Sequence, residues 1–311
     1  MLRIGTSGFS YPGPPPKGWC GAFYPERRGR GFNELSYYSR FFDAVEINSS
    51  FYRPPAASVV AGWVRRTPEH FEFTVKVWQK FTHAKKIGAD VSGGDDRWEE
   101  VGQGDVDLFL QGIEPLSESG KLGVLLFQYP AGFHRTAENV EKLHRVLDVF
   151  RSYPKVIELR HRSWSEERGA TWELLAERKT GWALIDEPKF GSSVKQDFDP
   201  AGEILYFRAH GRNAANWWNH AEPWMRYDYC YSGKEVHEFA GNLKKVMEER
   251  KDLRKGYAFF NNHARGQAVV NAIMLKNEMG TPVNAVPSEE LLKAFPQLSG
   301  IVPAPPRRSL F

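Results

Sequence analysis

The sequence predicts an α/β protein: a single (β/α)8 TIM-type barrel with long loops at the C-terminal face of its strands. Two observations predict this class. Short apolar runs alternate with helical patterns almost throughout the 311 residues, which is typical of a parallel sheet covered by helices. The first run is not followed by the Gly-rich turn that opens a dinucleotide-binding doubly wound sheet. A closed barrel therefore fits better than an open sheet.

Eight strands are expected, and helical patterns fall in nearly every gap between them. The strands are 2–8, 44–51, 71–78, 122–129, 155–161, 182–187, 204–211 and 255–262. Helices are predicted where apolar residues recur at helical spacing, as do Val140, Leu143 and Leu147. They cover 33–42, 57–66, 106–117, 137–151, 171–179, 236–251 and 268–279. No helix is expected between the sixth and seventh strands.

Three connections are longer than a barrel requires. They span 9–31, 82–105 and 212–234, and each follows a strand, so we expect all three at the C-terminal face. The sequence beyond residue 280 is rich in proline. We therefore expect a barrel domain over 1–280 and a Pro-rich C-terminal tail or wrap over 281–311.

The composition excludes several classes of protein. A net charge of +4 permits an anionic partner but provides no polybasic coat for nucleic acid. The two cysteines predict neither a disulfide framework nor a cysteine metal site. No apolar run is long enough to span a membrane, and no secretory leader is evident, so we expect a cytoplasmic protein without a membrane partner.

The stretch from Val156 to Trp164 carries the densest group of ionisable residues. Because side chains alternate along a strand, Glu158 and Arg160 share one face while Ile157 and Leu159 share the other. Polar residues occur near the ends of other expected strands as well. We therefore expect a functional site at the C-terminal mouth of the barrel.

The candidates divide into proton-transfer groups and ligand-binding groups. The catalytic candidates are Glu46, Glu158 and His210. The candidates for substrate binding are cationic, amide, imidazole or aromatic side chains, namely Tyr52, Lys76, His83, Arg160, His161, Trp164, Arg208, Arg212, Asn261 and Asn262. Arginine offers a planar fork for phosphate or carboxylate, and lysine adds a point charge. The predicted partner is a small anionic or phosphate-bearing ligand, with nucleic acid as an alternative.

The predicted mechanism is acid/base hydrolysis of that ligand. His210 is the candidate proton-transfer group because an ordinary imidazole changes charge near cellular pH. One glutamate would orient it, and Lys76 with Arg160 would stabilise developing negative charge. In the competing interpretation, these residues form ion pairs that close the barrel interior, and Glu158 pairs with Arg160 or Arg208.

Three other functions stay open at this point. A metal-dependent hydrolase could draw its ligands from Glu46, Glu158, His161, Asp186, His210 and His83. Lys76 and the neighbouring arginines would oppose a divalent ion. No cofactor or metal site is therefore predicted, and a divalent metal is kept as an alternative. A glycosidase-type pair of Glu46 and Glu158 would need few cations nearby. A non-catalytic anion-binding protein would use the same arginine and lysine side chains.

Several strings also resemble a known family. They are Ile4–Gly8, Phe23–Pro25, Val45–Tyr52, Glu158–Trp164, His210–Arg212 and Phe259–Asn262. Together they resemble the YecE-like family, also called domain of unknown function 72, over about residues 2 to 280. The resemblance implies a TIM barrel similar in fold to the xylose-isomerase and endonuclease-four group. It implies no established activity.

Overall fold

The computed structural model describes residues 2–86 and 96–304, and it divides the chain into two compact units. Unit 1 comprises Met1–Glu46, Ile185–Lys189 and Phe207–Phe311. Unit 2 comprises Ile47–Leu184 and Phe190–Tyr206. Each unit combines parallel strands with helices, as the sequence predicts for an α/β protein.

Unit 1 contains β1, β11 and the C-terminal parts of β10 and β9, and these strands are hydrogen-bonded in the order β1-β11-β10-β9. These strands are β1 (Leu2–Thr6), β11 (Lys255–Phe260), β10 (Ile204–Ala209) and β9 (Leu184–Asp186). β2 (Ala44–Ile47) begins in this unit, and Ser7 forms an isolated parallel bridge with its Glu46. The carbonyl of Asp186 accepts from the amide of His210, and that of Ala209 accepts from the amide of Asn261, both at 2.8 Å. The C-terminal ends of β9, β10 and β11 are therefore adjacent.

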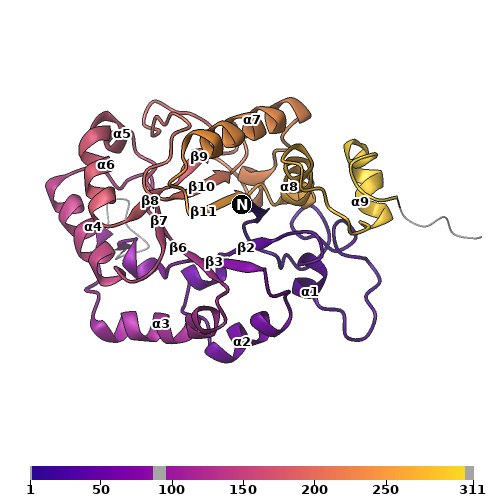
Figure 1. Cartoon of the computed structure of the whole chain (residues 1–311), viewed down its shortest axis with the longest axis horizontal. Helices are drawn as coiled ribbons and strands as arrows, with labels where there is room; N and C mark the ends of the chain where they lie inside the picture. The colour runs from indigo at the N-terminus through magenta and orange to yellow at the C-terminus, as the bar shows by residue number, and fades with distance from the viewer. Residues whose placement is uncertain (1, 87–95, 305–311) are drawn as a thin grey trace, which may run out of the picture. The chain divides into compact units, whose positions relative to one another are not determined.

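In unit 1, α8 lies against the sheet. α8 packs on both β1 and β11, and α7 packs on α8 (Figure 1). All residues of α8 from Gln267 to Lys276 are buried, including the polar side chains of Gln267, Asn271 and Lys276. The helices are α1 (Glu34–Tyr38), α7 (Gly233–Glu249), α8 (Gln267–Glu278) and α9 (Glu289–Ala294).

Unit 2 contains four strands that pair in the order β3-β6-β7-β8, all parallel. They are β3 (Glu72–Lys76), β6 (Leu122–Gln128), β7 (Lys155–Glu158) and β8 (Thr180–Trp182). β6 is buried along its centre, from Val124 to Phe127. Such near-continuous apolar strands are typical of parallel sheets whose two faces are both covered.

The helices of unit 2 follow these strands along the chain. α2 and α3 pack against each other, and α6 packs on β8 (Figure 1). The helices are α2 (Ala57–Arg65), α3 (Gln103–Glu118), α4 (Ala137–Val149), α5 (Ser163–Glu166) and α6 (Arg168–Glu177). A short antiparallel pair, β4 (Lys85–Lys86) and β5 (Asp96–Arg97), lies in the connection after β3.

Polar residues at the helix starts explain where several helices begin. Thr136 accepts from the amide of Asn139 at the start of α4. Ser232 and Glu235 form a reciprocal capping box at the start of α7. These contacts satisfy backbone N–H groups that have no partner within the helix.

The structure has a strand or helix in each expected place, but the strand expected over 44–51 ends at Ile47, and Ser49–Phe51 form a 3-10 helix instead. The expected strand 182–187 is divided at Ala183 into β8, which pairs with β7, and β9, which belongs to the sheet of unit 1. The segment after residue 280, expected as a tail or wrap, contains α9, where Leu291 is buried. Ser288 fixes this helix to unit 1 by donating to the carbonyl of Ala22 at 2.6 Å.

Within residues 2–86 and 96–304, no helix has both the length and the apolar character needed to cross a lipid bilayer.

Candidate functional site

Glu46 and Arg208 form a buried ion pair in unit 1. Glu46 lies near the end of β2 and Arg208 on β10, and their exposed fractions are 0% and 1%. The guanidinium makes two bonds to the carboxylate, Nε to Oε2 at 2.9 Å and Nη2 to Oε1 at 2.6 Å. Such a bidentate pair fixes the orientation of both groups and stabilises the ionised carboxylate in a dry environment.

His210 continues this arrangement one step further along β10. Its Nε2 lies 3.5 Å from Nη1 of Arg208, and its Nδ1 lies 3.0 Å from Nδ2 of Asn261. A guanidinium can only donate, so Nε2 is the acceptor in the contact with Arg208, and a neutral ring then carries its proton on Nδ1, where it faces the side-chain amide of Asn261. An imidazolium would direct N–H groups at both neighbouring nitrogens, so this geometry favours the neutral ring.

Tyr11, which stacks on His263, lies near the Glu46–Arg208 ion pair. Neither Tyr11 nor His263 was among the candidates from the sequence. Their rings stack at 4.7 Å with an interplanar angle of 12°. Burial raises the pKa of Tyr11 well above its usual range, and the carboxylate of Glu46 adds to this effect while Arg208 opposes it. Tyr11 is therefore a neutral hydroxyl near the Glu46–Arg208 pair. Tyr11 lies in the long connection 9–31, where no alternation of polar and apolar residues could identify it from the sequence.

Arg212 lies in a separate network of unit 1. It donates to both carboxylate oxygens of Asp186, with Nη2 2.7 Å from Oδ2, and it contacts Glu235 at 3.0 Å. Tyr231 also donates to Asp186, at 2.7 Å. The bond to Asp186 is the main reason that the pKa of Arg212 is raised. Two carboxylates therefore hold the guanidinium whether or not a ligand is bound.

Asn262 holds the segment around Tyr229 and Tyr231 in place. It is fully buried, and its Nδ2 donates to the carbonyl of Tyr229 and to Oδ1 of Asn271, both at 2.8 Å. Asn271 in turn bonds the backbone of Tyr231. This placement favours a positioning role for Asn262, because its amide nitrogen is occupied by protein groups.

In unit 2, Glu158 at the end of β7 is paired with Arg160. The Nε of Arg160 lies 2.6 Å from Oε1 of Glu158, and its Nη2 lies 2.5 Å from the same oxygen. The carboxylate is completely buried, whereas the arginine side chain is 14% exposed. The competing interpretation in which Glu158 pairs with Arg160 thus describes this contact correctly.

Lys76, Phe51 and His83 form a second group in unit 2. The Lys76 ammonium lies 3.9 Å from the centre of the Phe51 ring, and His83 contacts the same ring edge-on at 4.9 Å. The pKa of His83 is lowered to about 4, chiefly by burial and further by Lys76 and Arg160. Lys76 and Arg160 therefore act on the same imidazole. Tyr52 is 70% exposed beside Phe51.

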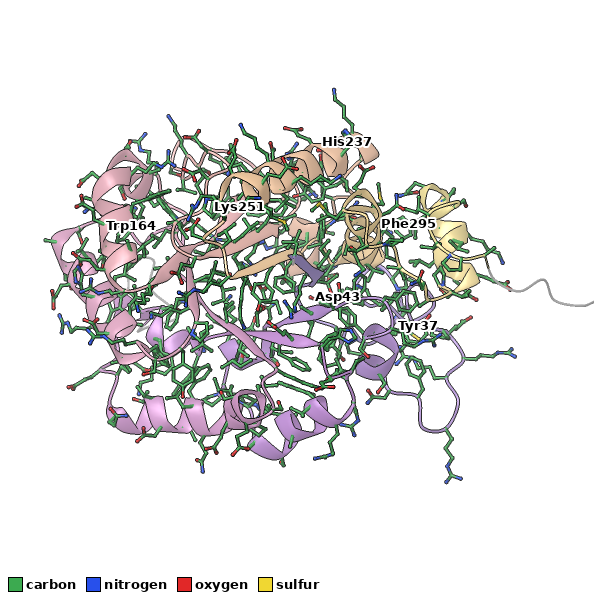
Figure 2. The ribbon with its side chains drawn as sticks, viewed as in Figure 1. Tyr37, Asp43, Trp164, His237, Lys251 and Phe295 are labelled. Carbon is green, nitrogen blue, oxygen red and sulfur yellow. The ribbon has the colours of Figure 1, made fainter. Side chains whose placement is uncertain are left out.

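His161 and Trp164 lie just after β7. His161 stacks on His134 at 3.8 Å and bonds Ser163, and burial together with His134 lowers its pKa. Trp164 lies on the side of unit 2 that carries α5 and α6 (Figure 2). It is fully buried, and its indole donates to the carbonyl of Phe133 at 2.7 Å. This favours a packing role, so stacking of Trp164 on a ligand stays a prediction.

Among the described residues, no three His, Cys, Asp or Glu side chains are grouped so that they could hold a metal ion. The carboxylates of Glu46 and Glu158 each contact an arginine instead. This donor set does not fit a divalent metal, because a guanidinium occupies the oxygen positions that the ion would need.

The structure brings the candidates together in two groups. Unit 1 contains Glu46, Arg208, His210 and Asn261 as one cluster, with Arg212 and Asn262 in neighbouring networks. Unit 2 contains Lys76, His83, Arg160 and Glu158. The convergence of Glu46 and Glu158 at one mouth stays a prediction, because the two residues belong to different units.

These features define an α/β protein of parallel strands whose C-terminal ends carry buried, ion-paired charges. The chain belongs to the family described as "Protein of unknown function DUF72", whose model matches residues 3–296, and this confirms the resemblance found in the sequence.

Relatives of known structure or name support this membership. The chain is 28% identical to the UPF0759 protein YunF of Bacillus subtilis (strain 168) over 281 residues, which is 87% of this chain and 92% of YunF. It resembles the crystal structure of a DUF72 family protein from Thermotoga maritima MSB8, with 32% identity, a TM-score of 0.72 and coverage of 90% and 99%. A DUF72 family protein from Enterococcus faecalis V583 gives 27% identity, a TM-score of 0.73 and coverage of 90% and 96%.

Proposed function

We propose that this protein binds a phosphate-bearing ligand, a nucleotide or a nucleic-acid-like molecule, and hydrolyses it by acid/base chemistry. The group formed by Lys76, His83 and Arg160 in unit 2 carries the proposal. Burial is the main cause of the lowered pKa of His83, and Lys76 and Arg160 lower it further, because the potential that these two cations create at the ring is positive. A positive potential beside a partly buried ring favours an anion.

The ring of Phe51 gives this group a second property. The Lys76 ammonium lies over one face of the ring, so an aromatic surface and a cation are presented together. A nucleotide combines a phosphate with a flat base, and both parts would find a complementary group here. Exposed Tyr52 beside Phe51 extends the aromatic surface.

In the chemical step, His210 is the proposed proton-transfer residue. Asn261 orients its ring, and the Glu46–Arg208 pair fixes the guanidinium beside Nε2. A neutral imidazole can accept a proton from an attacking water and return it to the leaving group. Glu46 is then a positioning residue that acts through Arg208.

The ion pairs weigh against two alternative functions. A glycosidase needs a carboxylate pair with few cations nearby, whereas Arg208 and Arg160 contact the carboxylates of Glu46 and Glu158 directly. A metal-dependent hydrolase needs free carboxylate oxygens. Anion binding without catalysis uses the same residues and is distinguished by the experiment below.

Calorimetric titration with adenosine 5′-monophosphate tests the binding step. We expect Lys76→Met to weaken binding about tenfold, because a charge-assisted contact to phosphate is lost. Lys80→Met is the matched control, because Lys80 lies four residues after Lys76 and its ammonium contacts Asp105 at 2.8 Å. Adenosine, which lacks the phosphate, should bind more weakly than the monophosphate to the wild type. Equal binding of both ligands, or equal affinities of both variants and the wild type, would contradict the proposal.

Release of inorganic phosphate from the monophosphate, or cleavage of an oligonucleotide, tests the chemical step. His210→Gln retains hydrogen-bonding groups but cannot transfer a proton near neutral pH, so it should bind the monophosphate normally and release no product. Binding without any turnover by the wild type would establish the non-catalytic alternative. Turnover that persists in His210→Gln across pH 5 to 9 would remove His210 from the mechanism.

The proposal includes a closed (β/α)8 barrel and a cytoplasmic location. The bridge between Ser7 and Glu46 supports pairing of β1 with β2, and the separation of β8 from β9 by the single residue Ala183 supports one continuous strand over both. A crystal structure in which β1 pairs with β2 and residues 180–186 form one continuous strand would bear out the closure, whereas an open sheet edge at either position would contradict it.

A further inference from the structure

Unit 2 contains a cavity of about 400 Å³ that no predicted site residue lines. Its walls are largely apolar and come from α4, from the end of β6 and from the segments after β3 and β5. They include Phe81, Trp98, Tyr129, Val146, Val149 and Phe150. This volume lies in the range of pockets that hold small organic molecules.

The hydroxyl group of Tyr129 is the polar feature of this wall that lacks a partner. Tyr129 is 1% exposed, and its Oη has no hydrogen-bond partner among the described residues. The ring is fixed by stacking on Phe133 at 4.1 Å. Burial raises the pKa of the phenol well above its usual range, so the group remains a neutral hydroxyl that can donate. A buried hydroxyl without a partner is unusual in folded proteins and marks a place for an acceptor atom.

The charged residues at the rim of the cavity do not require a charged ligand. Three cations line the cavity, and each is paired with a carboxylate elsewhere. The pairs are Lys80–Asp105 at 2.8 Å, Lys142–Glu138 at 2.8 Å and Arg145–Glu141 at 3.4 Å. Glu99 and Glu100 also line the cavity, so charges of both signs are present at its edge. A neutral occupant is therefore favoured.

The aromatic walls specify the shape of that occupant. Phe81, Trp98 and Phe150 line the space with rings, and the Lys142 ammonium lies over the Trp98 ring at 4.7 Å. Planar molecules gain offset-stacked or edge-on contacts with such rings in addition to buried area. We propose that this cavity is a binding site for a neutral aromatic molecule that carries a carbonyl or ether oxygen, with Tyr129 donating to that oxygen.

Two naphthalenes of nearly equal size test the proposal. 2-Acetylnaphthalene has the oxygen acceptor and 2-ethylnaphthalene lacks it, and their dissociation constants are measured by ligand-observed NMR. For the wild type we expect the acetyl compound to bind about 5- to 10-fold more tightly, as one neutral hydrogen bond provides. Tyr129→Phe removes only the hydroxyl group and should abolish this difference while leaving the ethyl compound unchanged.

Variants of exposed valines locate the binding. Val149→Trp, at a position that lines the cavity and is 50% exposed, should weaken both compounds at least tenfold. Val59→Trp on α2 is the matched control, because Val59 is 51% exposed and does not line the cavity. Binding that is unaffected by Val149→Trp, no detectable binding of either naphthalene, or an undiminished preference in Tyr129→Phe would each overturn the proposal.

This inference does not depend on the proposed phosphate site. Tyr129→Phe should bind adenosine 5′-monophosphate like the wild type, and Lys76→Met should bind 2-acetylnaphthalene like the wild type. The failure of one proposal therefore leaves the other intact.

Discussion

Gly5 lies in the middle of β1 where a neighbouring backbone approaches closely. A Cβ atom at this position would be 2.0 Å from the carbonyl oxygen of Ala44 and 2.8 Å from the hydroxyl of Tyr38. That hydroxyl also accepts from the amide of Thr6 at 2.8 Å. The absence of a side chain thus permits the contact between β1 and the start of β2, and with it the position of Glu46.

We predict that Gly5→Ala destabilises the protein by about 3 kcal/mol or more, because the backbone of Ala44 cannot move without disturbing β2. The free energy of unfolding in urea measures the effect. Gly104→Ala is the matched control, since nothing lies within 4 Å of the added atom in the first turn of α3. It should be neutral or stabilising, as expected for alanine in a helix. Similar stabilities of the two variants would show that β1 tolerates a Cβ.

The sequence predicted the positions of some functional candidates but not the surroundings of others. The alternation of polar and apolar residues identified Glu46, Glu158 and Arg208, because strand periodicity is local. The same pattern could not reveal that Trp164 is fully buried with its indole bonded, or that Tyr11 stacks on His263. Those facts depend on contacts between residues from different segments.

At the scale of elements, α2 ends in an arrangement that the sequence did not predict. Lys121, just before β6, is 6% exposed, and its ammonium donates to the carbonyls of Val64 and Thr67 at 2.9 and 2.8 Å. Burial lowers the pKa of this lysine. A cation at a helix C-terminus satisfies free carbonyls and interacts favourably with the helix dipole.

Lys121→Met should therefore destabilise unit 2 by about 2 kcal/mol, because two buried carbonyls lose a charged donor while the apolar stem is retained. Chemical denaturation provides the measurement. Lys251→Met is the control, since Lys251 is exposed after α7 (Figure 2). If both variants unfold at the same urea concentration, the ammonium contributes nothing at the end of α2.

At the scale of the molecule, two partly buried histidines make stability depend on pH. Burial lowers the pKa of His263 and of His83 to about 4, from an ordinary value of 6.5. Between these values the folded protein binds fewer protons than the unfolded chain. Stability is therefore fully present above pH 6.5 and falls as the pH falls towards 4.

We predict a loss of at most about 3 kcal/mol from His263 across this window, reduced by whatever solvent screens the ring. His263→Phe retains the stacking on Tyr11 but cannot titrate. It should lower stability at pH 7, because the bond from Nδ1 to the carbonyl of Asn261 is lost, and it should flatten the profile between pH 6.5 and 4. Urea denaturation at several pH values is the measurement. A variant with the same acid slope as the wild type would assign that slope to other groups.

The sequence by itself determined the parallel α/β class and the location of its elements. A strand or helix occurs in each expected place, apart from the 3-10 helix at Ser49–Phe51, because hydrophobic periodicity and capping residues act within a few positions of the chain. Tertiary structure decided which charges meet. Arg208 pairs with Glu46 across 162 positions, and Arg212 pairs with Asp186 rather than standing ready for a ligand. No local pattern encodes these partners, because they depend on which strand ends are neighbours in space and on the cost of burying a charge alone.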